Sequence, residues 1–174
     1  YNPFHNGHKF QIDDIRKKAG DCAIVSVMSG NYVQRAETAV MSKYARAKAA
    51  LLGGVDLVLE LPMPYAISSA ERFAYSSVHI LNSLGAVTDI SFGSECGSIS
   101  ILRKAVEALY DENVNLKLKA ELKNGVSYPA ARFSAVRDVF GAETAAVLSE
   151  PNNILAVEYI KALKALSSDM KPHT

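Results

Sequence analysis

The residues best suited to chemistry stand near the beginning of the sequence, where His5 and His8 are separated by two residues. Pro3 fixes its own φ, so a helix is expected to begin only after it. We predict that Asn6 is the N-cap of this helix and that Gly7 leaves room for the close approach of a ligand. The N–H groups and positive dipole of a helix N-terminus suit a phosphate. Two imidazoles placed there can donate hydrogen bonds to phosphate oxygens as negative charge develops in a transition state.

A parallel α/β sheet is predicted to position this loop. The predicted strands cover residues 22–28, 55–60 and 87–92. Helical patterns alternate with them at residues 9–18, 42–52 and 69–84. This alternation indicates a doubly wound parallel sheet with right-handed crossovers. We expect one further strand before Tyr1, outside this sequence.

The pattern changes after residue 97. Helices are predicted at residues 99–110, 115–123, 129–140 and 154–166. We therefore expect two domains, an α/β domain at 1–97 and a helical extension at 98–174 that leads into a further C-terminal part. The extension carries cations that either lie on a solvated surface or form part of an RNA-binding face. They are Arg103, Lys104, Lys117, Lys119, Lys123, Arg132 and Arg137.

Polar side chains follow the predicted strands at the edge where open α/β sheets bind ligands. The loop after the first of these strands begins at Ser29 and carries Arg35. Lys43 and Arg46 lie one turn apart on the helix that follows. Each of these features is also compatible with an ordinary solvated surface. Ser94 and Glu95 stand with Gly93 at the tip of the third strand.

Composition indicates an ordinary globular protein. The chain has 174 residues, 49% hydrophobic and 21% charged, with a formal net charge of +1, which does not discriminate for or against a nucleic-acid partner. No apolar run approaches the roughly 18–20 residues that span a bilayer, so we expect no membrane partner. Cys22 and Cys96 lie far apart and form no metal-ligand pair. Reduced thiols and a cytoplasmic location are the expected state.

Five blocks in the same order resemble the bacterial tRNA(Met) cytidine acetate ligase family of the His-x-Gly-His nucleotidyltransferase superfamily. They are residues 1–8, 27–35, 56–62, 92–95 and 151–155. The resemblance implies a Rossmann-like sheet of the nucleotidyltransferase type. It implies an enzyme that activates acetate with ATP as acetyl-adenylate. That enzyme then acetylates N4 of the wobble cytidine of elongator tRNA(Met).

The resemblance also assigns residues to roles. It implies that His5 and His8 are catalytic, and which of them donates a proton stays open. The implied ATP-binding residues are Tyr1, Asn2, Pro3, Phe4, His5, Asn6, Gly7, His8, Lys9, Phe10, Gly93 and Asn152. Asn152 is equally compatible with a simple capping role in the last helix. Candidate substrate or tRNA contacts are Ser29, Arg35, Lys43, Arg46, Ser94 and Glu95. We expect Mg²⁺ to accompany ATP, and no carboxylate cluster specifies a protein-held metal.

Two alternatives differ from the ligase in kind. One is an adenylyltransferase that acts on a small phosphorylated metabolite. It is weakened because we find no Ser/Thr-rich second motif ending in arginine. The other is a tRNA-binding scaffold with a decayed nucleotide site, and the intact His5, Gly7 and His8 argue against it.

Overall fold

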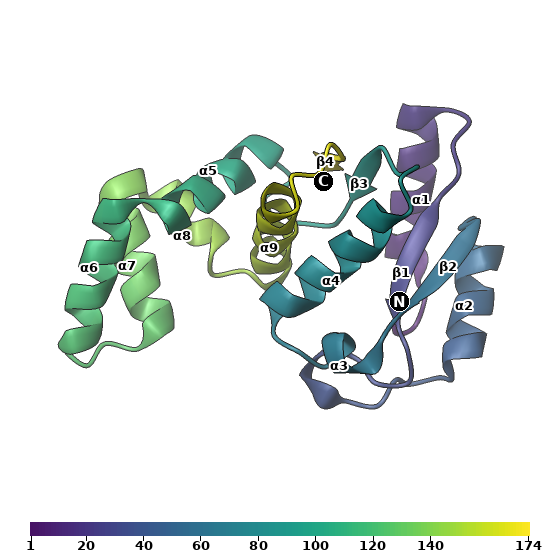
Figure 1. Ribbon diagram of the computed structural model, residues 1–174, viewed down its shortest axis with the longest axis horizontal. Helices are drawn as coiled ribbons and strands as arrows, with labels where there is room; N and C mark the ends of the chain where they lie inside the picture. The colour runs from purple at the N-terminus through teal and green to yellow at the C-terminus, as the bar shows by residue number, and fades with distance from the viewer. The chain divides into compact units, whose positions relative to one another are not determined.

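The computed structural model describes residues 1–174, apart from the side chain of Arg35. The chain divides into two compact units, Tyr1–Val87 and Thr88–Thr174 (Figure 1). The sequence predicted a domain boundary ten residues later, after residue 97. The compact units divide earlier because β3 (Asp89–Ser91) pairs with β4 (Lys171–His173) at the other end of its own unit.

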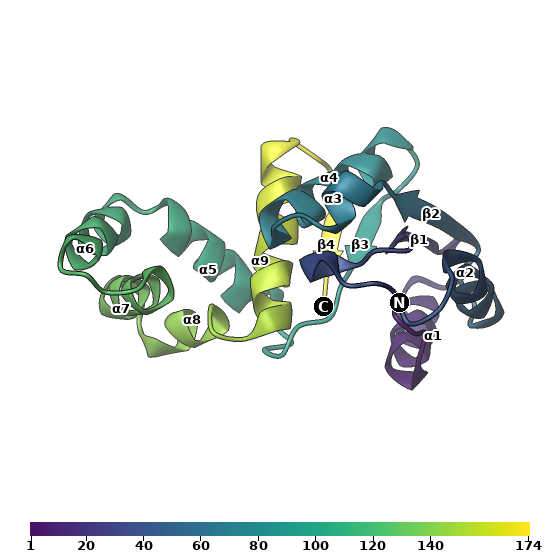
Figure 2. The ribbon, with the colours of Figure 1, turned by 90° about the horizontal axis from the view of Figure 1, so that it is seen from below.

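The first unit is built on a pair of parallel strands. β1 (Val25–Ser29) pairs with β2 (Leu57–Leu61), in a register that places Val25 opposite Leu57 and Ser29 opposite Leu61. Figure 2 shows helices on both sides of this pair. α1 (Asn6–Ala19) and α2 (Lys43–Leu52) lie on one side, and α3 (Met63–Ala66) and α4 (Ala70–Ser83) lie on the other. A short 3₁₀ helix, η1 (Gln34–Ala36), lies between β1 and α2.

The core beneath α1 and α2 anchors the N-terminal loop. It contains the buried side chains of Ile12, Ile24, Ala50 and Val55. Tyr1 and Phe4 are partly buried against this cluster. The same apolar contacts that stabilise the helices therefore also hold the loop that carries the two histidines.

A polar link closes the opposite end of α1. The Arg16 guanidinium donates to the carbonyl oxygens of Cys22 at 2.8 Å and Gly54 at 2.9 Å, and to Asp56 Oδ2 at 2.8 Å. Asp56 Oδ2 also accepts a hydrogen bond from Ile24 N at 2.7 Å. These bonds connect α1 to the starts of both strands, so the helix is held at its C-terminal end as well as through its core face.

The second unit combines the parallel pair β3–β4 with helices. They are α5 (Ile99–Tyr110), α6 (Glu112–Lys123), α7 (Tyr128–Phe140), α8 (Ala142–Val147) and α9 (Pro151–Ala165). α6 and α7 lie side by side (Figures 1 and 2). The helices predicted from the periodic pattern are present, while the sequence missed α8 and β4. Both are short, and the partner of β4 lies about 80 residues away in the chain, so no local signal marks them.

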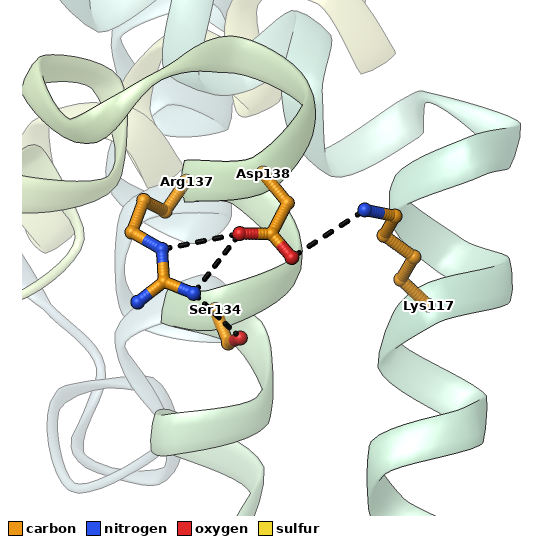
Figure 3. A network of polar contacts seen from close by, with 4 residues as sticks. All are labelled: Lys117, Ser134, Arg137 and Asp138. Atoms are coloured by element: carbon orange, nitrogen blue, oxygen red, sulfur yellow. Dashed lines mark hydrogen bonds and ion pairs between the residues drawn. The ribbon is translucent and has the colours of Figure 1, made fainter.

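Several of the predicted cations on these helices are engaged within the unit. Lys117 of α6 forms an ion pair with Asp138 of α7 at 3.4 Å, and Arg137 also contacts Asp138, at 3.0 Å (Figure 3). Arg132 donates to the carbonyl of Leu148 at 3.1 Å. Lys117 and Arg132 thereby link α7 to neighbouring segments, whereas the contact of Arg137 lies within α7. Within the described residues, we find no helix that is both long and apolar enough to cross a membrane.

Candidate functional site

The N-terminus of α1 is capped by the two histidines themselves. His5 is the N-cap residue, and its Nδ1 accepts a hydrogen bond from Gly7 N at 3.1 Å. His8 Nδ1 accepts from His5 N at 3.2 Å, which completes a reciprocal capping box. The prediction that Asn6 is the cap is therefore wrong by one residue, because an imidazole Nδ1 performs the acceptor role usually taken by a short polar side chain. Asn6 is the first helical residue and is exposed.

These hydrogen bonds determine which ring nitrogen is available to a ligand. In both rings Nδ1 is used as an acceptor, so the ring hydrogen lies on Nε2 in the neutral form. The rings of His5 and His8 are stacked, with centroids 3.8 Å apart and an interplanar angle of 29°. Among the described residues neither Nε2 has a hydrogen-bond partner. The site thus presents two Nε2–H donors from one helix end.

The charge state of His8 follows from its surroundings. Burial, followed by nearby positive charge, lowers the pKa of His8 below its usual value. The free protein therefore holds a neutral His8 ring near neutral pH. A phosphate placed against that ring would favour the protonated form again, since an opposite charge raises the pKa of a base.

Aromatic contacts fix the orientation of the His8 ring. The Tyr1 ring meets the His8 ring edge-on at 4.5 Å, and the Phe4 ring lies 5.6 Å from the same ring. Phe4 packs directly over Gly53, where a Cβ would lie only 2.3 Å from Phe4 Cζ. Only glycine leaves space for the ring at this position. The two aromatic residues of the loop thus support His8 and connect it to the core.

Gly7 has a comparable steric role. A Cβ on Gly7 would lie 3.0 Å from His5 Cε1, which is closer than side chains normally approach. The glycine of the His-x-Gly-His pattern therefore leaves the His5 ring where it is, whereas a Cβ would require the ring to shift by a few tenths of an ångström, in addition to any space the glycine gives a ligand. The remaining predicted residues of this segment are exposed: Lys9 is ion-paired with Asp13, and the Phe10 side chain is 74% exposed.

Arg46 holds the N-terminal loop against the tip of β1. Its side chain is only 1% exposed, and its guanidinium donates to Tyr1 O at 3.0 Å, Ser29 O at 3.1 Å and Met41 O at 3.1 Å. It also donates to Gly30 O. The arginine thereby joins segments that are far apart in the sequence. We assign it a positioning role, because a buried guanidinium with these bonds has no free face for a substrate.

Other predicted residues line the same end of the first unit. Lys43 Nζ pairs with Glu60 Oε2 at 2.6 Å, and the Glu60 carboxylate packs against Gly30 so closely that a Cβ there would lie 2.3 Å from it. Asn2 Oδ1 accepts from Val40 N at 3.0 Å. Ser29 contributes its carbonyl to Arg46. The predicted contact of Arg35 falls on a side chain outside the described residues.

A second group of predicted residues meets in the second unit, at the carboxyl end of β3. Glu95 Oε1 accepts from Asn152 N at 3.0 Å and from Asn152 Nδ2 at 2.9 Å, and Glu95 Oε2 accepts from Asn153 N at 2.7 Å. Although desolvation opposes its ionisation, these hydrogen bonds lower the pKa of Glu95. The sequence placed the last helix at residues 154–166 and allowed Asn152 to be its cap. α9 instead begins at Pro151, so Asn152 lies in its first turn, and the N–H groups of Asn152 and Asn153 are satisfied by the distant Glu95.

At the tip of β3, Gly93 borders open space, and Ser94 belongs to a polar turn. No atom lies within 4 Å of a Cβ built on Gly93. Ser94 Oγ accepts from Gly97 N at 3.0 Å and shares a hydrogen bond with Thr174 Oγ1 at 2.7 Å. The sequence missed Thr174 and the buried Asn153. Asn153 lies in the block at residues 151–155 that resembles the ligase family. This resemblance was the only signal from which its importance could have been predicted.

The described residues contain no group of three or more His, Cys, Asp or Glu side chains close enough together to hold a metal. The contacts described above divide the predicted site residues into two groups. One surrounds the histidines of the first unit, and the other surrounds Gly93 and Asn152 of the second unit.

A family model described as HIGH Nucleotidyl Transferase matches residues 1–174. The chain belongs to the HIGH nucleotidyl transferase family. The resemblance predicted from the five sequence blocks is thereby confirmed.

Curated relatives of this HIGH nucleotidyl transferase chain are tRNA(Met) cytidine acetate ligases. That of Acetivibrio thermocellus is 46% identical over 178 residues, covering 100% of this chain and 43% of the relative. That of Caldicellulosiruptor saccharolyticus is 48% identical over 176 residues, with the same coverage. The chain thus spans less than half the length of these relatives.

A solved structure gives the same result for the fold. The crystal structure of Thermotoga maritima TmcAL bound with alpha-thio ATP matches with a TM-score of 0.93 and 41% identity, covering 100% of this chain and 44% of that chain. The apo form of the same protein matches equally well in TM-score. The predicted α/β fold of the nucleotidyltransferase type is therefore confirmed.

Proposed function

We propose that the protein to which this HIGH nucleotidyl transferase chain belongs is an ATP-dependent tRNA(Met) cytidine acetate ligase. The observation that carries the proposal is the stacked pair His5–His8, which presents two Nε2–H donors at the start of α1. Hydrogen-bond donors fixed in this way suit the charge that develops on a phosphate during nucleotidyl transfer. The names of the curated relatives and the bound alpha-thio ATP of the related structure support ATP as the nucleotide and tRNA as the acceptor.

The reaction we propose has two steps. In the first, a carboxylate oxygen of acetate attacks the α-phosphorus of ATP, and the bond to pyrophosphate breaks. His5 and His8 stabilise the charge on the phosphate oxygens. A Mg²⁺ ion that accompanies ATP would supply positive charge to the pyrophosphate. In the second step, the N4 amine of cytidine attacks the acetyl carbonyl, loses a proton and releases AMP. Positioning and charge stabilisation suffice for the first step, without a nucleophile from the protein.

The residue assignments follow the two groups described above. In the first unit we assign His5 and His8 to the phosphates, with Gly7 allowing their close approach. Tyr1, Asn2, Pro3 and Phe4 hold this loop in place, and Asn6, Lys9 and Phe10 complete the predicted nucleotide-binding segment. In the second unit we assign Gly93 and Asn152 to the nucleotide.

Partner and substrate contacts outside the nucleotide are also part of the proposal. Ser29, Lys43 and Ser94 stand near the strand tips of their own units and are the candidates for acetate or tRNA contact. Glu95 was predicted as a further contact, but its carboxylate is occupied by the start of α9. Elongator tRNA(Met) is the proposed acceptor and acetate the proposed acyl donor.

The direct test is acetylation of tRNA by the complete protein. ATP, Mg²⁺, isotopically labelled acetate and a tRNA pool are incubated with the protein, and the nucleosides are separated by mass spectrometry. The proposal predicts labelled N4-acetylcytidine that requires ATP and is lost in the His8→Ala variant. Unlabelled cytidine in every tRNA, with protein that binds ATP, would overturn it.

A further inference from the structure

One carboxylate organises the start of α9. Glu95 receives hydrogen bonds from the backbone N–H of Asn152, from the backbone N–H of Asn153 and from the Asn152 side-chain amide. Because a carboxylate only accepts, the nitrogen end of the Asn152 amide must face it. The oxygen end then points away from Glu95. Among the described residues Asn152 Oδ1 has no hydrogen-bond partner.

We propose that Glu95 is a positioning residue that orients the Asn152 amide so that Oδ1 accepts a hydrogen bond from an uncharged donor of the bound nucleoside. This inference rests on the proposed function, in which Asn152 contacts the nucleotide. The donor is either an exocyclic amine of the base or a hydroxyl of the ribose. Both carry the N–H or O–H group that an amide oxygen recognises.

Electrostatics favour an uncharged group over a phosphate at this point. The first N–H groups of a helix ordinarily attract anions. Here the N–H groups of Asn152 and Asn153 are already occupied by Glu95, whose hydrogen bonds favour its ionised form. A phosphate beside Asn152 would meet this negative charge. The start of α9 therefore selects the nucleoside part of the nucleotide.

The surrounding loop is held firmly enough to maintain this geometry. The Asn153 side chain is 3% exposed, and its Oδ1 accepts from Cys96 N at 3.0 Å. On the other side, Ser94 is bonded to Thr174 at 2.7 Å. The residues on both sides of Glu95 are thus fixed to neighbouring elements. Gly93 adds open space beside the loop, where a side chain would otherwise stand.

The experiment compares nucleotide discrimination in the complete protein. Dissociation constants are measured by calorimetry for ATP, for inosine triphosphate and for 2′-deoxy-ATP and 3′-deoxy-ATP. Inosine triphosphate replaces the 6-amino group by a carbonyl, and each deoxy analogue lacks one hydroxyl. The parent is compared with Glu95→Gln, Asn152→Ala and the double variant. Glu150→Gln is the matched control, because Glu150 stands at the same helix end and its side chain makes no capping hydrogen bond.

The parent is expected to bind ATP about 2- to 10-fold more tightly than the one analogue that lacks the recognised donor. That analogue identifies the base or the ribose as the source. Asn152→Ala should remove the preference, Glu95→Gln should reduce it, and Glu150→Gln should retain it. The double variant should discriminate to the same extent as Asn152→Ala, since Glu95 acts through Asn152. A change in this ratio is not expected from a loss of stability alone.

Three results would overturn the inference. An undiminished preference in Glu95→Gln would remove the positioning role. Equal binding of ATP and all analogues by the parent would show that no uncharged donor is recognised. Failure of the parent to bind ATP at all would overturn both the proposed function and the inference. The first two results, in contrast, would overturn the inference and leave the proposed function standing.

Discussion

Replacement of Arg46 by methionine tests whether one buried side chain holds the histidine loop in place. Methionine keeps most of the aliphatic volume but removes four hydrogen bonds to backbone carbonyls. At about 1 kcal/mol net for each bond, the loss is about 4 kcal/mol. Relief from burying a charge acts in the opposite direction. We therefore expect the free energy of unfolding to fall by about 3 kcal/mol.

The assay is urea denaturation followed by far-UV circular dichroism. Lys48→Met is the matched control, because Lys48 is an exposed residue of the same helix and loses the same charge. It should change the free energy of unfolding by less than about 0.5 kcal/mol. Arg46→Lys should lie between the two, since an ammonium group cannot reach all the carbonyls that the guanidinium fork reaches. If Arg46→Met were as mild as Lys48→Met, the positioning role would be refuted.

Three further predictions concern the loop and the tip of β3. Gly7→Ala should weaken ATP binding, measured by calorimetry, because its Cβ would displace the His5 ring; unchanged affinity would contradict the steric role. Titration of the complete free protein by NMR should give His8 a pKa below its unfolded value of about 6.5. The contribution of His8 to stability is therefore complete above about pH 6.5 and is lost as the pH falls through the lowered pKa. His8→Ala should flatten that part of the stability profile, and a His8 pKa above 6.5 would refute this. Gly93→Ala should leave the melting temperature unchanged, because open space surrounds its Cβ, but should weaken nucleotide binding; a matching loss of stability would contradict it.

The parts of the site that could be predicted from the sequence are those made by near neighbours. His5 and His8 lie three residues apart, and their cap bonds and stacking join residues within this short segment. Their arrangement at a helix start was therefore readable from spacing and from the position of Pro3. The error of one residue in the cap arose because the pattern suggested the short polar side chain of Asn6 rather than an imidazole.

The rest depended on contacts between distant residues. Arg46 was predicted as a substrate or tRNA contact or as an ordinary surface cation. Its buried role could not be predicted, because its partners come from three separate segments and no periodicity marks them. β4 contains a proline and only three residues, and its partner is β3. Glu95 caps a helix more than 50 residues further on. Such bonds join residues that are far apart in the sequence, so no local pattern indicates them. They become visible only when the folded structure brings the residues together.

The measurement that tests the central claim most directly is ATP–pyrophosphate exchange by the complete protein, with and without acetate and in the absence of tRNA. Formation of acetyl-adenylate predicts exchange that depends on acetate and is abolished in the His8→Ala variant. A protein that binds ATP but shows no acetate-dependent exchange, even after tRNA is added, would contradict the account.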